Sequence, residues 1–242
     1  MQLFVTCLVD SLFPHVGESV VRVLERAGLT VEFPFDQTCC GQPAFNAGFP
    51  DEARAMARHT IDVLVDTDGP IVVPSGSCAQ MIIDHAPSLL AADNDYLANA
   101  QLVSARTREF TMFLVDDLAV TAPGVRRDAT FATYHPSCHG LRGLGITTQP
   151  MRLLEGIAGL KVVDLPDAET CCGFGGIFSV EMPEISVAML ATKLDNVAGT
   201  GADVLVGGDV GCLMHMEGGL RRRADADIAV VHIAELLDGR ET

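Results

Sequence analysis

Eight cysteines recur as two sets of four, and this repeat limits what the chain can fold into more than any other feature. The second set follows the first by 131, 132, 132 and 134 residues, and in both sets a vicinal Cys-Cys pair runs directly into glycine. Such a constant register is not expected by chance, so it predicts an internal duplication with one site in each half. The cysteines are Cys7, Cys39, Cys40 and Cys78, then Cys138, Cys171, Cys172 and Cys212.

Short apolar runs alternate with amphipathic segments around these cysteines. Strands that alternate with helices imply a parallel sheet with right-handed crossovers. We therefore expect an α/β fold of two pseudo-symmetric parallel-sheet halves, with domains at residues 1–122 and 123–242. The expected strands are 2–9, 31–35, 71–74, 130–134, 162–165 and 204–209; the expected helices are 18–28, 51–66, 97–119, 151–158 and one that opens at Pro183. The helix 97–119 and the turn at Ala122-Pro123-Gly124 are expected to join the halves.

The order of cysteines and strands predicts where each site lies. In each half one cysteine follows the first strand, the pair follows the second and the last follows the third. Ligands of parallel α/β sheets collect beyond the carboxyl ends of the strands, so the four thiols should converge there. Glycine after each pair permits the turn that brings both neighbours to one site. Cys78 and Cys212 stand at expected helix starts, where free N–H groups favour thiolate.

Four thiols at one centre suit either an iron–sulfur cluster or tetrahedral zinc. Zinc sites usually draw ligands from close C-x-x-C pairs, which this chain lacks, so a cluster is favoured and zinc remains the alternative in either half. Structural disulfides are disfavoured, because vicinal bridges are strained and a cytoplasmic chain keeps its thiols reduced. Inert buried cysteines would not repeat in register.

Composition narrows the partners and the compartment. Asp and Glu outnumber Lys and Arg by 32 to 16, for a net charge of −16. Such a surface repels nucleic-acid phosphates and anionic membranes, so we expect no nucleic-acid partner. No apolar run reaches the roughly 20 residues of a transmembrane helix, and the start of the chain lacks a secretory pattern. A cytoplasmic location without a transmembrane segment is expected.

Three histidines flank cysteines of the second half only. They are His135, His139 and His215, and the first half has no histidine at the matching places. They could be outer-shell donors, proton carriers coupled to electron transfer, or locally packed side chains. The asymmetry predicts that the two sites differ in potential or occupancy. No other catalytic candidate stands out.

Five motifs connect the chain with a known family. They are Cys39-Cys-Gly-Gln-Pro-Ala-Phe-Asn-Ala-Gly48, Pro74-Ser-Gly-Ser-Cys78, His135-Pro-Ser-Cys138-His139, Cys171-Cys-Gly-Phe-Gly-Gly176 and His232-Ile-Ala-Glu-Leu-Leu237. They resemble the cysteine-rich CCG domain that occurs twice in one component of heterodisulfide reductase and in the iron–sulfur components of glycolate oxidase and anaerobic glycerol-3-phosphate dehydrogenase. By length and motif the chain is most similar to the lactate utilization protein A family.

The resemblance implies an iron–sulfur electron-transfer subunit, an oxidoreductase component of a complex that oxidises L-lactate to pyruvate. It implies one [4Fe-4S] cluster per half, a ferredoxin-type iron–sulfur partner and a third subunit. The wider family motif has a fifth cysteine in each domain, where this chain has Ser75 and Asp209. Four cysteines fit one cubane cluster, and Asp209 is either an oxygen ligand or, preferably, a helix cap. The alternatives are disulfide or quinone reduction at the cluster and a non-catalytic, zinc-stabilised scaffold.

Overall fold

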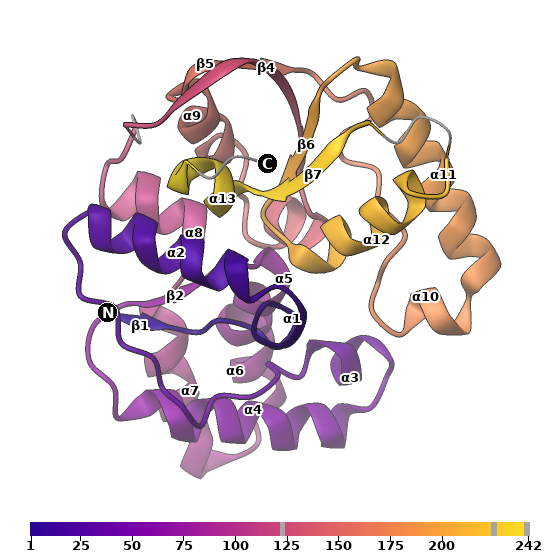
Figure 1. The fold of residues 1–242 in the computed structure, drawn as a ribbon. Helices are drawn as coiled ribbons and strands as arrows, with labels where there is room; N and C mark the ends of the chain where they lie inside the picture. The colour runs from indigo at the N-terminus through magenta and orange to yellow at the C-terminus, as the bar shows by residue number, and fades with distance from the viewer. Residues whose placement is uncertain (122–123, 224–226, 240–242) are drawn as a thin grey trace.

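The computed structural model describes residues 1–121, 124–223 and 227–239, and its ribbon forms two halves with helices between them (Figure 1). All strand pairs are parallel, in the order β1-β2-β3 in the first half and β5-β4-β6-β7 in the second. This confirms the predicted α/β fold of two parallel-sheet halves. The strands are β1 (Gln2–Leu3), β2 (Ile71–Val73), β3 (Thr107–Glu109), β4 (Arg126–His135), β5 (Ala158–Val163), β6 (Val204–Gly207) and β7 (Ala229–His232).

Helices cover the sheets and join the strands. Several open on proline in the first turn, where its missing N–H costs nothing. The first-half helices are α1 (Cys7–Leu12), α2 (Pro14–Arg26), α3 (Gln42–Asn46), α4 (Pro50–Val65), α5 (Gly76–Gln80), α6 (Ala86–Leu89), α7 (Asn94–Arg106) and α8 (Phe110–Met112), with π-helical turns at Met81–His85 and Phe113–Asp117. The second-half helices are α9 (Gln149–Glu155), α10 (Phe178–Glu181), α11 (Pro183–Gly199), α12 (Val210–Leu220) and α13 (Ile233–Asp238), with a π-helical turn at His139–Gly143. Among the described residues, no helix has the length and apolar character of a membrane span.

The two sheets repeat the same arrangement of positions. An isolated parallel bridge between Gln2 and Glu32 takes, in the first half, the place that β5 takes in the second. Beyond it, β1, β2 and β3 correspond to β4, β6 and β7. The two halves therefore direct the carboxyl ends of corresponding strands to corresponding places, which is what the repeated cysteines require.

Buried side chains form three clusters, and the largest is shared by both halves. Neighbouring residues of a strand enter different clusters because the pleat alternates their direction. Val72 and Val206 lie in the shared cluster, whereas Val73 and Leu205 lie in clusters confined to the first and second half. The shared cluster lies between the two sheets, so burial of its apolar surface holds the halves together.

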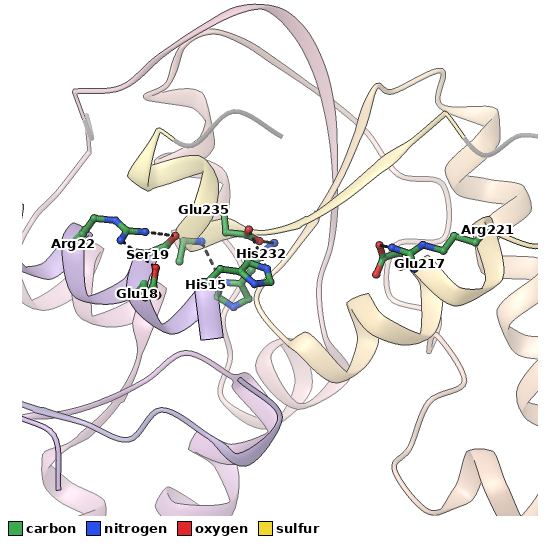
Figure 2. Close-up of polar contacts among 9 residues, drawn as sticks. His15, Glu18, Ser19, Arg22, Glu217, Arg221, His232 and Glu235 are labelled. Atoms are coloured by element: carbon green, nitrogen blue, oxygen red, sulfur yellow. Dashed lines mark hydrogen bonds and ion pairs between the residues drawn. The ribbon is translucent and has the colours of Figure 1, made fainter. Parts of the chain in front are cut away.

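The C-terminal helix α13 also joins the halves, because it packs on α2. Figure 2 shows His15 of α2 directed toward Glu235 of α13, with 3.5 Å between His15 Nε2 and Glu235 Oε1. Beside them Arg22 Nε donates to Asp238 Oδ2 at 2.7 Å. His232 begins α13 as its cap, since its ring accepts from the Ala234 N–H.

Three expectations need correction. The predicted helix 97–119 is interrupted, because Thr107–Glu109 pairs with β2 as an edge strand and Glu109 caps the next helix. Strand 2–9 ends early, since α1 begins at Cys7, and 31–35 contributes only the bridge at Glu32. β7 and α13 are elements that the sequence patterns did not predict. The predicted domain boundary between residues 122 and 123, and most of the turn there, lie outside the described residues.

Candidate functional site

All eight cysteines line one cavity of about 180 Å³ at the junction of the two halves. In each half the first cysteine lies at a helix start, the pair lies in the loop before α3 or α10, and the last lies in the first turn of α5 or α12. Cys40 and Cys172 are buried, at 3% and 2% exposed, and the other six are half-buried. The structure thus brings the predicted ligands together, and it places the two sets at one cavity.

Glycine makes the turn after each vicinal pair possible. Gly41 and Gly173 have φ values of 90° and 91°, in the left-handed region that side chains disfavour. A Cβ at Gly173 would also lie 2.5 Å from the Ser186 carbonyl oxygen of α11. The repeated Cys-Cys-Gly sequence therefore has a backbone reason in both halves.

The thiols of each half are hydrogen-bonded to one another. In the first half Cys40 and Cys7 donate to Cys39, which lowers the pKa of Cys39 to about 3 and raises the pKa values of both donors. Cys138 and Cys172 likewise donate to Cys171 and lower its pKa. The thiols of each half therefore share protons through these hydrogen bonds, and a metal that binds thiolates would displace those protons.

The donor set fits a thiolate-bound metal group, either an iron–sulfur cluster or a single zinc ion in each half. The sulfurs of a four-thiolate zinc site lie about 3.8 Å apart at the usual zinc–sulfur distance, and hydrogen-bonded thiols lie about as close. The cavity that both sets line also leaves open space beside the thiols, as a larger iron–sulfur group would need. His135, at the end of β4 and 2% exposed, has a ring nitrogen within 4.8 Å of the sulfurs of Cys172 and Cys212. Neither of its ring nitrogens has a hydrogen-bond partner in the structure, and a bound metal or ion is one explanation for a buried polar group of this kind.

The two ring nitrogens of His135 without partners predict that an apolar side chain at this position stabilises the metal-free chain. Burial lowers the pKa of His135 to about 3, so the ring is neutral at pH 7 and both nitrogens are left unsatisfied. We expect His135→Leu to raise the free energy of unfolding of the metal-free chain by about 1–3 kcal/mol. Urea unfolding in the presence of a thiol reductant measures this. His139→Leu is the control and should not stabilise the chain, because the ring of His139 has hydrogen-bond partners. A lower free energy of unfolding in His135→Leu than in wild type would contradict the prediction.

The other two predicted histidines also lie beside the site. His139 bridges the halves, with Nε2 2.9 Å from Gln42 Nε2 and Nδ1 2.7 Å from Gln80 Oε1. His215 lies 3.4 Å from the Ser186 hydroxyl, and its ring packs on Phe174. Burial lowers the pKa of both histidines. Their role as proton carriers remains a prediction.

Ser75 and Asp209, which replace the family's fifth cysteines, contact each other across the junction. Both cap helices: Ser75 Oγ accepts from the Cys78 N–H at 3.3 Å, and Asp209 Oδ1 accepts from the Gly211 N–H at 3.2 Å. Ser75 Oγ also donates to Asp209 Oδ2 at 3.1 Å, and the Ser77 N–H donates to the same oxygen at 3.0 Å. The structure supports the capping interpretation of Asp209 and adds its role in joining the halves.

The backbones of the two halves pack closely beside the Ser75–Asp209 contact. A Cβ at Gly76 would stand 2.9 Å from Cα and N of Gly140 and from the Ser137 hydroxyl of the other half. Gly76→Ala is therefore expected to lower the free energy of unfolding by about 1–3 kcal/mol, because backbone cannot move aside cheaply. Gly218→Ala, inside α12 with nothing within 4 Å, is the matched control and should stabilise by about 0.5–1 kcal/mol. Equal urea midpoints for the two variants would contradict this packing.

Three polar residues near the site were not predicted: the buried Glu109 and Lys193 and the half-buried Tyr134. Glu109 is 3% exposed, and burial raises its pKa to about 7. Tyr134 borders the same small cavity as Glu109, and burial raises its pKa. Lys193 is completely buried in α11. Glu109 was hidden inside the predicted helix 97–119, and aligning the two halves position by position would have singled out Lys193.

Comparisons with known proteins agree with the repeat. The model of the cysteine-rich domain family CCG matches residues 1–83 and 132–217. Proteins named lactate utilization protein A are similar over nearly the full length. One from an Exiguobacterium species is 47% identical over 237 residues, which cover 98% of this chain and 96% of that protein. One from Shouchella clausii is 45% identical, covering 100% and 99%, and one from Bacillus cereus is 47% identical, covering 98% of each.

Proposed function

This chain belongs to the lactate utilization protein A family, built on two cysteine-rich CCG domains, and from that premise we propose an iron–sulfur electron-transfer subunit that serves lactate oxidation. The reaction would be the conversion of L-lactate to pyruvate by a cytoplasmic complex. A ferredoxin-type iron–sulfur protein and a third subunit would be its partners. The observation that carries the proposal is the convergence of all eight thiols on one cavity.

Each half would hold one metal group with its own four cysteines. Cys7, Cys39, Cys40 and Cys78 would hold one [4Fe-4S] group, and Cys138, Cys171, Cys172 and Cys212 the other. Such a group, when bound, stores and releases single electrons. Cys39 and Cys171, whose pKa values are lowered by the neighbouring thiols that donate to them, would be the first ligands to lose their protons in each half.

The surrounding residues would limit the access of water to both metal groups and hold their ligands in position. Cys40 and Cys172 are covered by apolar clusters, which lowers the dielectric around the sulfurs. The last cysteine of each half lies in the first turn of α5 or α12, and the Ser75–Asp209 contact joins the starts of these two helices. Because both sets of thiols line one cavity, electrons could pass between the halves without leaving the chain.

Zinc is the second candidate, and the trio of His135, Cys172 and Cys212 is the observation that favours it in the second half. Anaerobic purification separates the two. A brown protein with iron, acid-labile sulfide and an EPR signal after reduction supports the proposal. A colourless, zinc-loaded protein that takes up no iron would overturn it. Bleaching by L-lactate in the presence of the partner proteins, and not without them, would place lactate binding in a partner.

A further inference from the structure

The two halves bury matching helices, and one matching pair differs in charge. Helices α4 and α11 both open on proline, and each buried residue of α11 follows its α4 counterpart by 133 positions. The buried residues are Ala53, Ala57, Thr60, Ile61 and Leu64 in α4, and Ser186, Leu190, Lys193, Leu194 and Val197 in α11. The place of the uncharged Thr60 is therefore taken by Lys193 in the second half.

Lys193 is a lysine whose side chain lies inside the protein. The chain has only two lysines, and this one is 0% exposed. Its Nζ donates to the carbonyl oxygens of Asp167 and Ala168, at 2.9 and 3.0 Å. Within the described residues no carboxylate lies at ion-pair distance from it. A buried ammonium without a counter-charge is costly, so an anion should be found nearby.

The second set of thiols is a source of negative charge close to Lys193, together with the Asp167 carboxylate. The two carbonyls that hold Lys193 lie in the loop that leads into Cys171 and Cys172, and Cys172 packs in the same cluster as the α11 neighbours Leu190 and Leu194. Burial lowers the pKa of Lys193, while negative charge at Cys172 and then, in decreasing order, at Asp167, Cys171 and Cys212 acts to raise it. A thiolate-bound iron–sulfur group is anionic and gains one further negative charge on reduction.

The first half has no such cation. Thr60 is buried without a charge, and its hydroxyl has no hydrogen-bond partner. Phe4, completely buried, stands 131 residues before His135 and takes its place. His135 and Lys193 lie beside the second set of thiols. At the matching positions of the first half stand the apolar Phe4 and the uncharged Thr60.

We propose that Lys193 is the counter-charge of the group held by Cys138, Cys171, Cys172 and Cys212, and that the second-half site therefore has the higher reduction potential. This rests on the proposed function. When an external donor supplies one electron, that donor is oxidised, the second-half site is reduced, the first-half site stays oxidised, and no proton is required. Electrons that enter through the first half would move toward the second.

A redox titration of the anaerobically loaded full-length chain, followed by EPR, tests the proposal. Two midpoints are expected, and the higher one should disappear in Cys138→Ser. Lys193→Met should lower that midpoint by at least the equivalent of a tenfold change in the reduced fraction, which is 59 mV for one electron. Lys193→Arg should retain it. Lys161→Met, which removes the other lysine, exposed on β5, is the matched control and should change neither midpoint.

Two results would overturn the proposal: a higher midpoint that survives Cys138→Ser and belongs to the first half, or a second-half midpoint unchanged by Lys193→Met. If Lys193→Met does not load with iron, Co²⁺ affinity of the metal-free chain decides, by competition with a chelator. The counter-charge predicts at least tenfold weaker second-half binding in Lys193→Met than in Lys161→Met, and equal affinities would refute it. A wild-type chain that binds Co²⁺ in this Lys193-dependent way but never takes up iron would overturn the proposed function alone.

Discussion

Replacing Cys172 by serine is expected to remove the metal group of the second half and to leave that of the first. The Cys172 thiol is 2% exposed, donates to the Cys171 thiolate and lies within reach of Cys212 and His135. A serine hydroxyl is a harder and much less acidic donor, so it does not replace a thiolate at a soft metal. Iron and acid-labile sulfide per chain should fall to about half of the wild-type content.

The duplication supplies the matched variant. Cys40→Ser removes the equivalent buried thiol of the first half and should give the same loss of iron from the other site, with an EPR signal that differs from that of Cys172→Ser. The double variant should bind no iron. Full iron content in Cys172→Ser would show that this thiol is not a ligand, and complete loss in either single variant would show that the two sites form only together.

Replacing Glu109 by glutamine is expected to remove a pH-dependent loss of stability. Burial raises the pKa of Glu109 from 4.5 to about 7, against hydrogen bonds from Thr111 and Met112 that favour the charged form. The folded chain therefore keeps a proton that the unfolded chain loses. Stability from this group is fully present below pH 4.5 and is lost as the pH rises through 7. The difference corresponds to about 3 kcal/mol.

The measurement is urea unfolding of both chains from pH 4.5 to 8. Glutamine keeps the acceptor oxygen for the Thr111 and Met112 N–H groups, so the fold should survive. The stability of Glu109→Gln relative to wild type should rise by about 3 kcal/mol across this range. Glu155→Gln, at an exposed position at the end of α9, controls for the loss of one charge. Parallel curves for wild type and Glu109→Gln would contradict a protonated Glu109 at neutral pH.

Much of the fold could be predicted because it depends on local order along the chain. Apolar periodicity predicted a helix at 51–66 and a strand at 71–74, and a first-turn proline predicted a helix from Pro183. The structure has these elements at Pro50–Val65, Ile71–Val73 and Pro183–Gly199. The prediction failed at Thr107–Glu109, where three extended residues separate two helices. So short a strand has no period of its own, and its pairing with β2 alone makes it a strand.

The sequence shows that only the second half has histidines beside its cysteines. It does not show which of these histidines are buried or which have hydrogen-bond partners. Proximity in sequence placed His135, His139 and His215 near cysteines. Only the packed structure separates them: His139 is hydrogen-bonded to Gln42 and Gln80 of the other half, whereas both ring nitrogens of His135 are without partners. Burial and partnership depend on neighbours that are distant in sequence.

The repeated cysteines, by themselves, determined the duplication and the division of the eight thiols into two sets of four, and the alternation of apolar and amphipathic segments predicted the parallel α/β architecture. These follow because spacing between strand ends is a property of each half alone. Only the tertiary structure decided that both sets line one cavity, that Ser75 and Asp209 meet there, and that Lys193 is buried beside the second set only. The physical reason is that these depend on how two halves dock. Docking is set by contacts between residues far apart in the chain, such as Gly76 with Gly140 and Ser75 with Asp209, and these contacts leave no periodic trace in the sequence.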